Sequence, residues 1–196
     1  MTATEKILKA AESNGGTITT KQVDDLNIHR TYLRNLVDKG LLEHSARGVY
    51  VLPEMLDDEF YNLQIRFKKG VFSNTSALYL LGFTDRTPIK LDMTFPASYN
   101  TSSIKNEINA HRVKKEIYEQ GIETALTPSG NKVNVYCIEH TLCDILQTRY
   151  AIDIQVITDA FKRYSRCNNK NLPLLSEFAK LTRVEGRVRQ YLEVLI

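Results

Sequence analysis

The sequence predicts an α+β protein, with an N-terminal winged helix-turn-helix over residues 1–53 and a mixed α/β domain over residues 54–196 that ends in a helical segment. Three observations lead to this prediction. The first 53 residues contain three short helical patterns and then two strand patterns that meet at a tight turn. Strand-like alternation and turn clusters continue through residues 89–138. Helical periodicity then dominates residues 139–195.

The first two helices are marked by their ends. Apolar residues recur at helical spacing over residues 4–13, and Asn14-Gly15-Gly16 ends that pattern. Thr19 and Gln22 have the spacing of a capping box, in which each side chain accepts a hydrogen bond from the backbone N–H of the other. We therefore expect a second helix that begins after Thr19 and ends near Leu26.

A third helix and a hairpin complete the N-terminal pattern. Residues 29–39 repeat apolar side chains on one helical face, and Gly40 can adopt the left-handed conformation that ends a helix. Residues 41–44 and 49–52 then flank Ala46-Arg47-Gly48 as two strands. Three helices closed by such a hairpin are typical of a winged helix-turn-helix.

The remaining residues predict a second set of elements. Residues 108–113 fit a strand or a helix, and we expect a strand. The others are, in chain order, a helix that starts at the acidic cluster Asp57-Asp58-Glu59 and runs to Gly70, a helix over 73–81, a strand over 89–95, a hairpin turn at 127–131 followed by a strand, and helices over 139–149, 153–166, 173–181 and 184–195.

The composition is that of an ordinary soluble protein, with 42% hydrophobic and 25% charged residues and a net charge of +3. Residues 160–196 hold eight basic and three acidic residues, so the positive charge is concentrated there. No apolar run approaches the roughly 18 residues of a membrane span, and the N-terminus lacks the pattern of a secretion signal. We therefore expect a cytoplasmic protein whose Cys137, Cys143 and Cys167 are free thiols.

The third helix carries the candidate DNA-reading residues, because the last helix of a helix-turn-helix enters the major groove. Thr31, Arg34 and Asn35 fall opposite the apolar face, while His29 and Arg30 precede the helix. Arginine can donate two hydrogen bonds to guanine, and asparagine can make two with adenine. The alternative is a solvated helix face without a ligand.

Arg47 is a candidate contact at the hairpin tip. Gly48 allows a tight turn that directs Arg47 toward a DNA phosphate or the adjacent minor groove, and a solvated turn residue is the alternative. Basic side chains elsewhere would add phosphate contacts without sequence preference, unless they only form a solvated surface. These additional candidates are Lys21, Lys162, Arg163, Arg166, Lys170, Arg183, Arg187 and Arg189.

Two patterns raise an enzyme or metal alternative. Cys137, His140 and Cys143 have a zinc-like spacing, but a structural zinc site needs a fourth ligand and none follows nearby, which favours core packing. Glu139 and Asp144, together with His140, could form a metal site of nuclease type, although a helix cap or a salt link is the commoner role. We expect no catalytic residue, no metal and no cofactor.

The residues also resemble a known family. The run GGTITTKQVDDLNIHRTYLRNLVDKGLLEHSARGVYVLP, residues 15–53, resembles the N-terminal winged-helix domain of AbiEi-type antitoxins of bacterial abortive-infection type IV toxin–antitoxin systems. Further segments look like successive motifs of that family's C-terminal domain, in the same order: GVFSNTSALYLLGFTDRTP, DMTFP, VYCIEHTLCDIL and YLEVL. The resemblance thus extends over essentially the whole chain.

This resemblance implies an antitoxin, active in phage defence, that also represses its own operon. Residues 1–53 would bind inverted repeats upstream of the operon, with help from basic surface on the C-terminal domain. Residues 54–196 would counter a nucleotidyltransferase-like toxin, for which no stable complex is assumed. The positions that would contact DNA are His29, Arg30, Thr31, Arg34, Asn35 and, on the wing, Arg47. His29 stands where the family often has a small hydroxyl residue, so it could be a cap or a base contact.

The sequence leaves the assembly and two other functions open. It contains no coiled-coil seam, so we expect a monomer that pairs on double-stranded DNA and does not bind a membrane. A winged-helix regulator with a ligand-sensing C-terminal domain is the first alternative. A metal-dependent nucleic-acid enzyme that uses Glu139, His140 and Asp144 is the second.

Overall fold

The computed structural model describes residues 1–53 and 58–195, which divide into two compact units. The first unit comprises Met1–Lys68 and Thr127–Asn131, and the second comprises Lys69–Leu126 and Lys132–Ile196. Helices and strands occur in both units, so the α+β class is confirmed. The division at Pro53 stays a prediction, because compactness alone does not show which segment folds independently.

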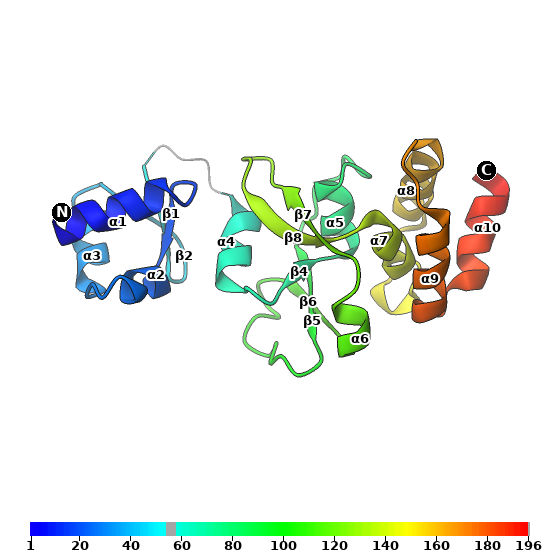
Figure 1. Cartoon of the computed structure of the whole chain (residues 1–196), viewed down its shortest axis with the longest axis horizontal. Helices are drawn as coiled ribbons and strands as arrows, with labels where there is room; N and C mark the ends of the chain where they lie inside the picture. The colour runs from blue at the N-terminus through cyan, green and yellow to red at the C-terminus, as the bar shows by residue number, and fades with distance from the viewer. Residues whose placement is uncertain (54–57, 196) are drawn as a thin grey trace. The chain divides into compact units, whose positions relative to one another are not determined.

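The first unit builds its helices and strands from short segments (Figure 1). Its elements are α1 (Ala3–Glu12), β1 (Thr17–Thr19), α2 (Thr20–Asp25), α3 (Thr31–Asp38), β2 (Glu43–Ala46), β3 (Val49–Val51) and α4 (Glu59–Arg66). The predicted capping box begins α2: Thr19 Oγ1 accepts from the Gln22 backbone N–H at 3.1 Å, and Gln22 Oε1 accepts from the Thr19 backbone N–H at 2.7 Å. The predicted ends of the first three helices are confirmed to within two residues.

Strand β1 is a feature that the sequence did not predict. It pairs antiparallel with β3, so that Thr17 lies opposite Val51 and Thr19 opposite Val49. Strand β3 therefore lies between β1 and β2 in the sheet. Three residues are too few to show alternation, and Thr19 also caps a helix, so only the pairing partner identifies this segment as a strand.

The predicted start of β2 at Leu41 is wrong by two residues, because Leu41 helps to end α3. Gly40 has φ +66°, and its N–H donates to the carbonyl of Val37 at 2.9 Å. The N–H of Leu41 donates to the carbonyl of Leu36 at 2.9 Å. These bonds satisfy carbonyls that a helix end leaves without partners, so the strand begins only at Glu43.

The core of the first unit lies between α1, α2, α3 and the sheet. Buried apolar side chains from all three helices and from β1 contact one another: Ile7, Ala11, Ile18, Val23, Ile28, Leu33, Leu36 and Leu42. Full burial of one leucine or isoleucine contributes about 1.5–3 kcal/mol. The core therefore holds each helix with its polar face outward.

Helix α4 is joined to the rest of the first unit by polar contacts. Asp58 caps the helix by accepting from the Tyr61 N–H at 3.1 Å, and it also accepts from Asn131 Nδ2 at 2.9 Å. The Tyr61 hydroxyl donates to Asn14 Oδ1 at 3.0 Å. The prediction that this helix runs to Gly70 is wrong, because Phe67 leaves the helical region with ψ 66°. Asp57 lies outside the described residues.

The second unit is built on a mixed sheet in the order β6-β5-β4-β8-β7. Strands β4–β5 and β7–β8 pair antiparallel, whereas β4–β8 and β5–β6 pair parallel. Its elements up to the last strand are β4 (Val71–Phe72), α5 (Asn74–Leu80), β5 (Asp92–Pro96), β6 (Asn109–Val113), α6 (Lys115–Tyr118), β7 (Ile122–Leu126) and β8 (Lys132–Tyr136). The predicted strand near 108–113 and the hairpin around 127–131 are confirmed.

Three details of this sheet differ from the prediction. Strand β4 was not predicted, because two residues carry no periodicity. Strand β5 begins at Asp92 instead of residue 89, and Ile89 is fully exposed. Helix α6 was not predicted in the segment before β7, since one helical turn gives too short a pattern.

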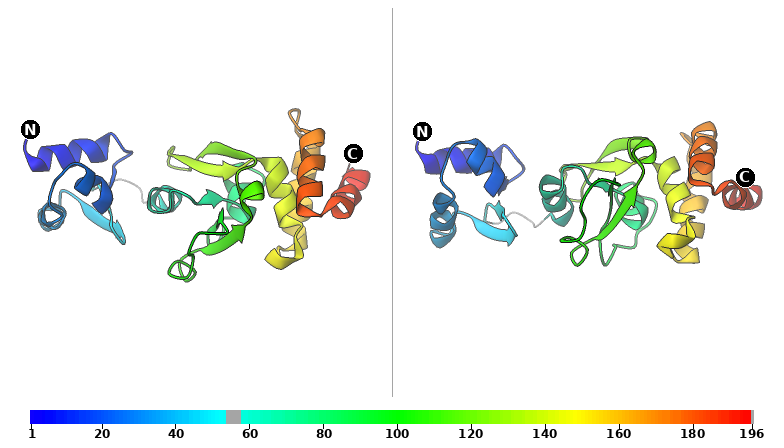
Figure 2. Two further views of the ribbon diagram at one scale, coloured as in Figure 1. Left: turned by 60° about the horizontal axis from the view of Figure 1, so that its bottom comes forward. Right: turned by 90° about the horizontal axis from the view of Figure 1, so that it is seen from below.

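The chain ends in α7 (Ile138–Ile145), the 3₁₀ turn η1 (Thr148–Tyr150), α8 (Ile154–Arg166), α9 (Leu172–Thr182) and α10 (Glu185–Leu195). Helices α8, α9 and α10 lie together on the far side of α7 from the sheet (Figure 2). The predicted inward face of α8 is confirmed, because Val156, Ile157, Ala160, Phe161 and Tyr164 are all buried. The predicted helix over 139–149 is wrong beyond Ile145, where extended backbone at Gln147 (ψ 122°) separates α7 from η1.

Candidate nucleic-acid interface

Helix α3 presents one apolar and one polar face, as its sequence indicates. Leu33 and Leu36 are 1% and 2% exposed and pack into the core of the first unit. Arg34 and Asn35 are exposed on the other side of the helix. Tyr32 is 42% exposed beside them, and sequence reasoning did not single it out, although an aromatic residue on a polar face is a recognisable signal.

His29 and Thr31 are engaged with each other at the start of α3. His29 Nδ1 lies 2.6 Å from Thr31 Oγ1 and accepts from the Thr31 backbone N–H at 3.3 Å. A side-chain acceptor on one of the first N–H groups is what a helix cap provides. The residue at the N-cap position itself is Arg30, whose side chain makes no capping hydrogen bond, so the role of His29 as a cap or a base contact stays a prediction.

Arg30 is held by Asp24 of α2. The guanidinium Nε and Nη2 donate to Asp24 Oδ1 and Oδ2 at 2.9 and 2.5 Å, which is the two-pronged geometry that arginine forms with a carboxylate. The Arg30 guanidinium holds the pKa of the Asp24 carboxyl below its usual value. Both side chains are solvent-accessible, so this pair fixes the geometry of the α2–α3 turn more than it stabilises the fold.

The hairpin tip is fixed to the start of α2. Gly48 has φ +74°, and its carbonyl accepts from the Thr20 N–H at 3.0 Å. Arg47 is exposed at this tip, and Lys21, the residue after Thr20, is exposed as well. Arg47 is therefore carried by a turn whose backbone is held in place.

The predicted basic residues of the C-terminal helices fall into two groups. Arg163 pairs with Asp85 and donates to the Gly82 carbonyl at 2.9 Å. Lys170 Nζ donates to the carbonyls of Ser165 and Cys167 at the end of α8. Arg187 Nη1 donates to the Leu146 carbonyl at 2.5 Å. The exposed remainder, Lys162, Arg166, Arg183 and Arg189, make no side-chain hydrogen bond or ion pair within residues 1–53 and 58–195.

The residues of the enzyme alternative are buried in the second unit. Glu139 accepts from the Tyr164 hydroxyl at 3.0 Å and from the Asn171 N–H at 3.1 Å, so it joins α7 to α8 and α9. His140 stacks on Phe178 at 4.6 Å, and its Nε2 lies 3.7 Å from Asp144 Oδ2. These contacts favour packing and hydrogen bonding as the role of these side chains.

The cysteines of the zinc-like pattern are buried as well. Cys143 Sγ donates to the Leu175 carbonyl, and burial raises the pKa of the Cys137 thiol to about 11. All three cysteines are free thiols, as the sequence predicts. Among the described residues, no group of three or more His, Cys, Asp or Glu side chains is placed to hold a metal ion.

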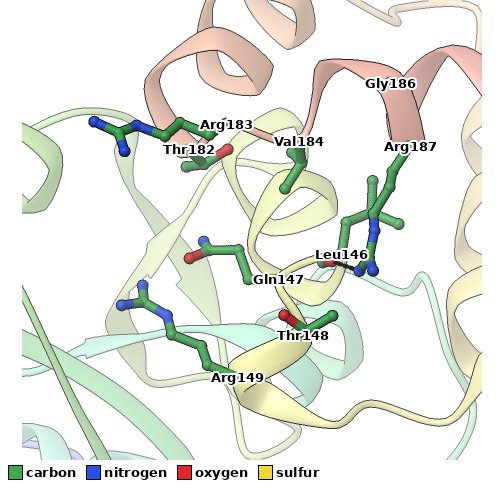
Figure 3. A pocket seen from close by; sticks show the side chains of 9 residues that line it. All are labelled: Leu146, Gln147, Thr148, Arg149, Thr182, Arg183, Val184, Gly186 and Arg187. Atoms are coloured by element: carbon green, nitrogen blue, oxygen red, sulfur yellow. Dashed lines mark hydrogen bonds between the residues drawn. The ribbon is translucent and has the colours of Figure 1, made fainter.

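Arg149 belongs to a basic cavity that the sequence did not indicate. It lines a space of about 480 Å³ together with Arg183 and Arg187 (Figure 3). Arg149 comes from η1, whereas Arg183 and Arg187 come from the α9–α10 connection and the start of α10, more than 30 residues later in the chain. No local pattern could have revealed that they meet.

A second polar cluster lies between β5, β6 and η1. His111 Nε2 lies 2.7 Å from Asp92 Oδ1, and the Thr75 hydroxyl donates to Asp92 Oδ2 at 2.6 Å. The Tyr150 ring packs edge-on against His111 with the ring centres 4.7 Å apart. Asp92 and His111 line a cavity of about 490 Å³, and both were missed because the pairing of β5 with β6 brings them together.

Comparison with known proteins supports the N-terminal part of the resemblance and the fold. Residues 5–53 match the family described as "Transcriptional regulator, AbiEi antitoxin", which confirms the resemblance over that segment. The crystal structure of the RV2827C protein from Mycobacterium tuberculosis has a similar fold, with a TM-score of 0.60 and 12% identity over 98% of this chain and 81% of that one. No sequence among curated proteins matches the chain. Within residues 1–53 and 58–195, no helix is long and apolar enough to span a bilayer.

Proposed function

We propose that the protein is an antitoxin and a DNA-binding transcriptional autorepressor, and that residues 1–53 form a winged helix-turn-helix. The observation that carries the proposal is the pairing of an exposed, polar α3 face with a hairpin that has Arg47 at its tip, within the segment that matches the AbiEi antitoxin regulator family. The order α1-β1-α2-α3-β2-β3 is compatible with this class of DNA-binding domain.

In this proposal α3 is the recognition helix. Arg34 and Asn35 reach base edges in the major groove, because both are exposed and their side chains suit guanine and adenine. His29, Arg30 and Thr31 lie at the N-terminal end, where their mutual contacts and the pair with Asp24 hold the helix start in position.

Arg47 contacts a phosphate or the adjacent minor groove from the wing. Its exposure leaves its guanidinium donors available to a ligand. Lys21 and three exposed side chains of the C-terminal helices, Lys162, Arg166 and Arg189, add phosphate contacts that carry no sequence information.

The antitoxin role belongs to residues 54–196. It is supported by the family description of residues 5–53 and by the order of the motifs that follow them. We propose a type IV system of abortive infection and phage defence, in which the protein counters a nucleotidyltransferase-like toxin without a stable complex. The protein acts in the cytoplasm, is not itself an enzyme, and binds its inverted repeats as monomers that pair on DNA.

A mobility-shift assay with the region upstream of the gene tests the repressor role. Purified protein should retard duplexes that contain the inverted repeats at submicromolar concentration in moderate salt, and a scrambled duplex should need far more protein. Equal retardation of both duplexes would reject sequence-specific repression.

Co-expression with the neighbouring gene tests the antitoxin role separately. Cells that express the downstream nucleotidyltransferase-like gene should stop growing, and the full chain should restore growth. A variant with Arg34→Ala and Arg47→Ala should still restore growth, because DNA binding and toxin neutralisation are assigned to different residues. Failure of the unaltered chain to restore growth would reject the antitoxin role.

A further inference from the structure

The cavity around Arg149, Arg183 and Arg187 has the composition of an anion site. It lies where the end of α7, η1 and the connection between α9 and α10 meet, all within the second unit. Thr148 and Thr182 also line it, and so does Gln147. Figure 3 shows the side chains of Arg149 and Arg183 extending on the same side of Gln147.

Each arginine is held by a different feature. Arg187 Nη1 donates to the carbonyl of Leu146, the C-terminal cap of α7, so its remaining N–H groups stay available. The guanidinium of Arg149 lies over the ring of Tyr150, 4.6 Å from the ring centre. Arg183 sits at the end of α9 with φ 61° and ψ 41°.

The backbone of Arg183 is unusual for a side chain of this size. The left-handed region favours glycine or asparagine, and other residues adopt it at an energetic cost. A helix that ends in this conformation usually has glycine at this position. The chain instead has an arginine here, and its exposed guanidinium lines the cavity. Strain of this kind is often found at ligand sites.

The charges at the cavity are not balanced by acidic groups that line it. Its lining residues, all within the described part of the chain, include three arginines and neither Asp nor Glu. Asp144 does not line the cavity, but its Oδ1 accepts a hydrogen bond from Nε2 of the lining residue Gln147 at 2.8 Å. Burial raises the pKa of the Asp144 carboxyl, because the charged form is disfavoured away from water.

We propose that this cavity binds the terminal phosphate of a small phosphate monoester such as a nucleoside monophosphate. Guanidinium groups recognise phosphate through paired, charge-assisted hydrogen bonds. Arg149 and Arg183 extend on the same side of Gln147, whereas the guanidinium of Arg187 lies on the other side, at the Leu146 carbonyl (Figure 3), so the first two are the phosphate ligands of this proposal. A volume of about 480 Å³ is within the range of small-ligand sites. An internal phosphate of DNA is flanked by sugars on both sides, so a concave site favours a terminal phosphate. The site is separate from DNA reading by α3.

Titration calorimetry with adenosine 5′-monophosphate, adenosine and inorganic phosphate, on the full chain, tests the proposal. We expect saturable one-to-one binding of the monophosphate, weaker binding of phosphate alone and no binding of adenosine. Equal heats for adenosine and its monophosphate, or no binding of the monophosphate at millimolar concentration, would overturn the proposal.

The variant Arg183→Asn separates ligand binding from folding. Asparagine tolerates the left-handed region, so the melting temperature should stay the same or rise, while loss of the guanidinium should weaken monophosphate binding by about tenfold or more. Lys180→Gln is the matched control, because it removes one exposed positive charge from the same helix without altering the cavity. An equal loss of affinity in both variants would indicate a general charge effect and would reject the site.

One further variant tests the cavity itself, and one competition experiment distinguishes a terminal phosphate from the phosphates of DNA. Arg149→Gln should also weaken monophosphate binding, because Arg149 lines the cavity from η1. A duplex without terminal phosphates should not displace the monophosphate at concentrations that saturate α3. Displacement by that duplex would assign the cavity to the DNA footprint and would overturn the proposal.

Discussion

Arg30 and Asp24 form a two-pronged ion pair across the turn between α2 and α3, with donor–acceptor distances of 2.9 and 2.5 Å. Arg34, on the exposed face of the same helix, makes no side-chain hydrogen bond or ion pair with any residue that the structure describes. Two arginines that look equivalent in the sequence therefore differ in the free protein. One fixes the geometry of the turn, and the other is available to a ligand.

Replacing Arg34 with alanine should change which DNA sequence the protein prefers. If Arg34 makes a paired contact to guanine, its loss costs about 1–3 kcal/mol on the operator and little on unrelated DNA. Competition binding with operators altered at single base pairs measures this change. Arg30→Ala is the control, and it should leave the order of preference unchanged. A shifted preference for Arg30→Ala, with none for Arg34→Ala, would exchange the two assignments.

Replacing Arg47 with alanine should weaken binding to operator and to unrelated DNA by similar factors. A contact to phosphate carries no sequence information, so the ratio between the two affinities should remain constant. Arg47→Lys should retain most of the affinity if the contact is to a phosphate. Unchanged affinity of Arg47→Ala on both duplexes would show that the arginine is only a turn residue.

The salt dependence of binding should reveal which basic residues of the C-terminal helices contact DNA. Each lost phosphate contact reduces the slope of log K against log salt by about 0.9. The combined variant Lys162→Gln, Arg166→Gln and Arg189→Gln should therefore flatten the slope. Arg163→Gln should not, because Arg163 is engaged with Asp85 and the Gly82 carbonyl. An unaltered slope in the combined variant would remove these helices from the footprint.

Asp144→Asn should alter how stability depends on pH. Burial raises the pKa of Asp144 in the folded protein above its usual value of 3.8, while His140, Arg149 and His111 oppose this rise. The native state therefore holds this proton more tightly than the unfolded chain does. The free energy of unfolding should fall as the pH rises from about 3.8 toward the folded pKa.

In the Asp144→Asn variant, the asparagine keeps a carbonyl oxygen that can accept from Gln147, but its side chain does not titrate. The variant should lose this part of the pH dependence and be relatively more stable at neutral pH. Urea unfolding at several pH values between 4 and 7 measures the difference. An identical pH profile for both proteins would show that Asp144 does not contribute.

Gly121→Ala should destabilise the second unit strongly. Gly121 has φ +71°, and an added Cβ would lie 2.8 Å from Phe178 Cζ and 2.9 Å from Cys137 Sγ. The left-handed backbone costs about 1–2 kcal/mol for alanine, and overpacking adds about 1–3 kcal/mol. Chemical denaturation measures the sum.

Gly130→Ala is the matched control for this effect. Gly130 has φ +84°, but an added Cβ would meet no atom within 4 Å. Only the backbone cost of about 1–2 kcal/mol should appear. Equal losses in the two variants would show that Phe178 and Cys137 do not restrict a side chain placed at position 121.

The parts of the fold that the sequence predicted are those set by neighbouring residues. The capping box of Thr19 and Gln22, the end of α3 at Gly40 and the buried face of α8 each depend on side chains within a few positions. The exposure of Arg34 and Asn35 follows from the local helical periodicity, and that of Arg47 follows from the tight turn at Gly48. For these features the sequence alone was sufficient.

The tertiary structure alone decided the features that join distant segments. Strands β1 and β4 have three and two residues, so they exist only because β3, β5 and β8 offer backbone partners. The pairing of Asp92 with His111 and the cavity that Arg149 lines together with Arg183 and Arg187 also need segments that lie far apart in the chain. Caps and turns are fixed by the hydrogen bonds and backbone preferences of adjacent residues, whereas a cavity and its charges arise only when the packed elements bring their side chains together.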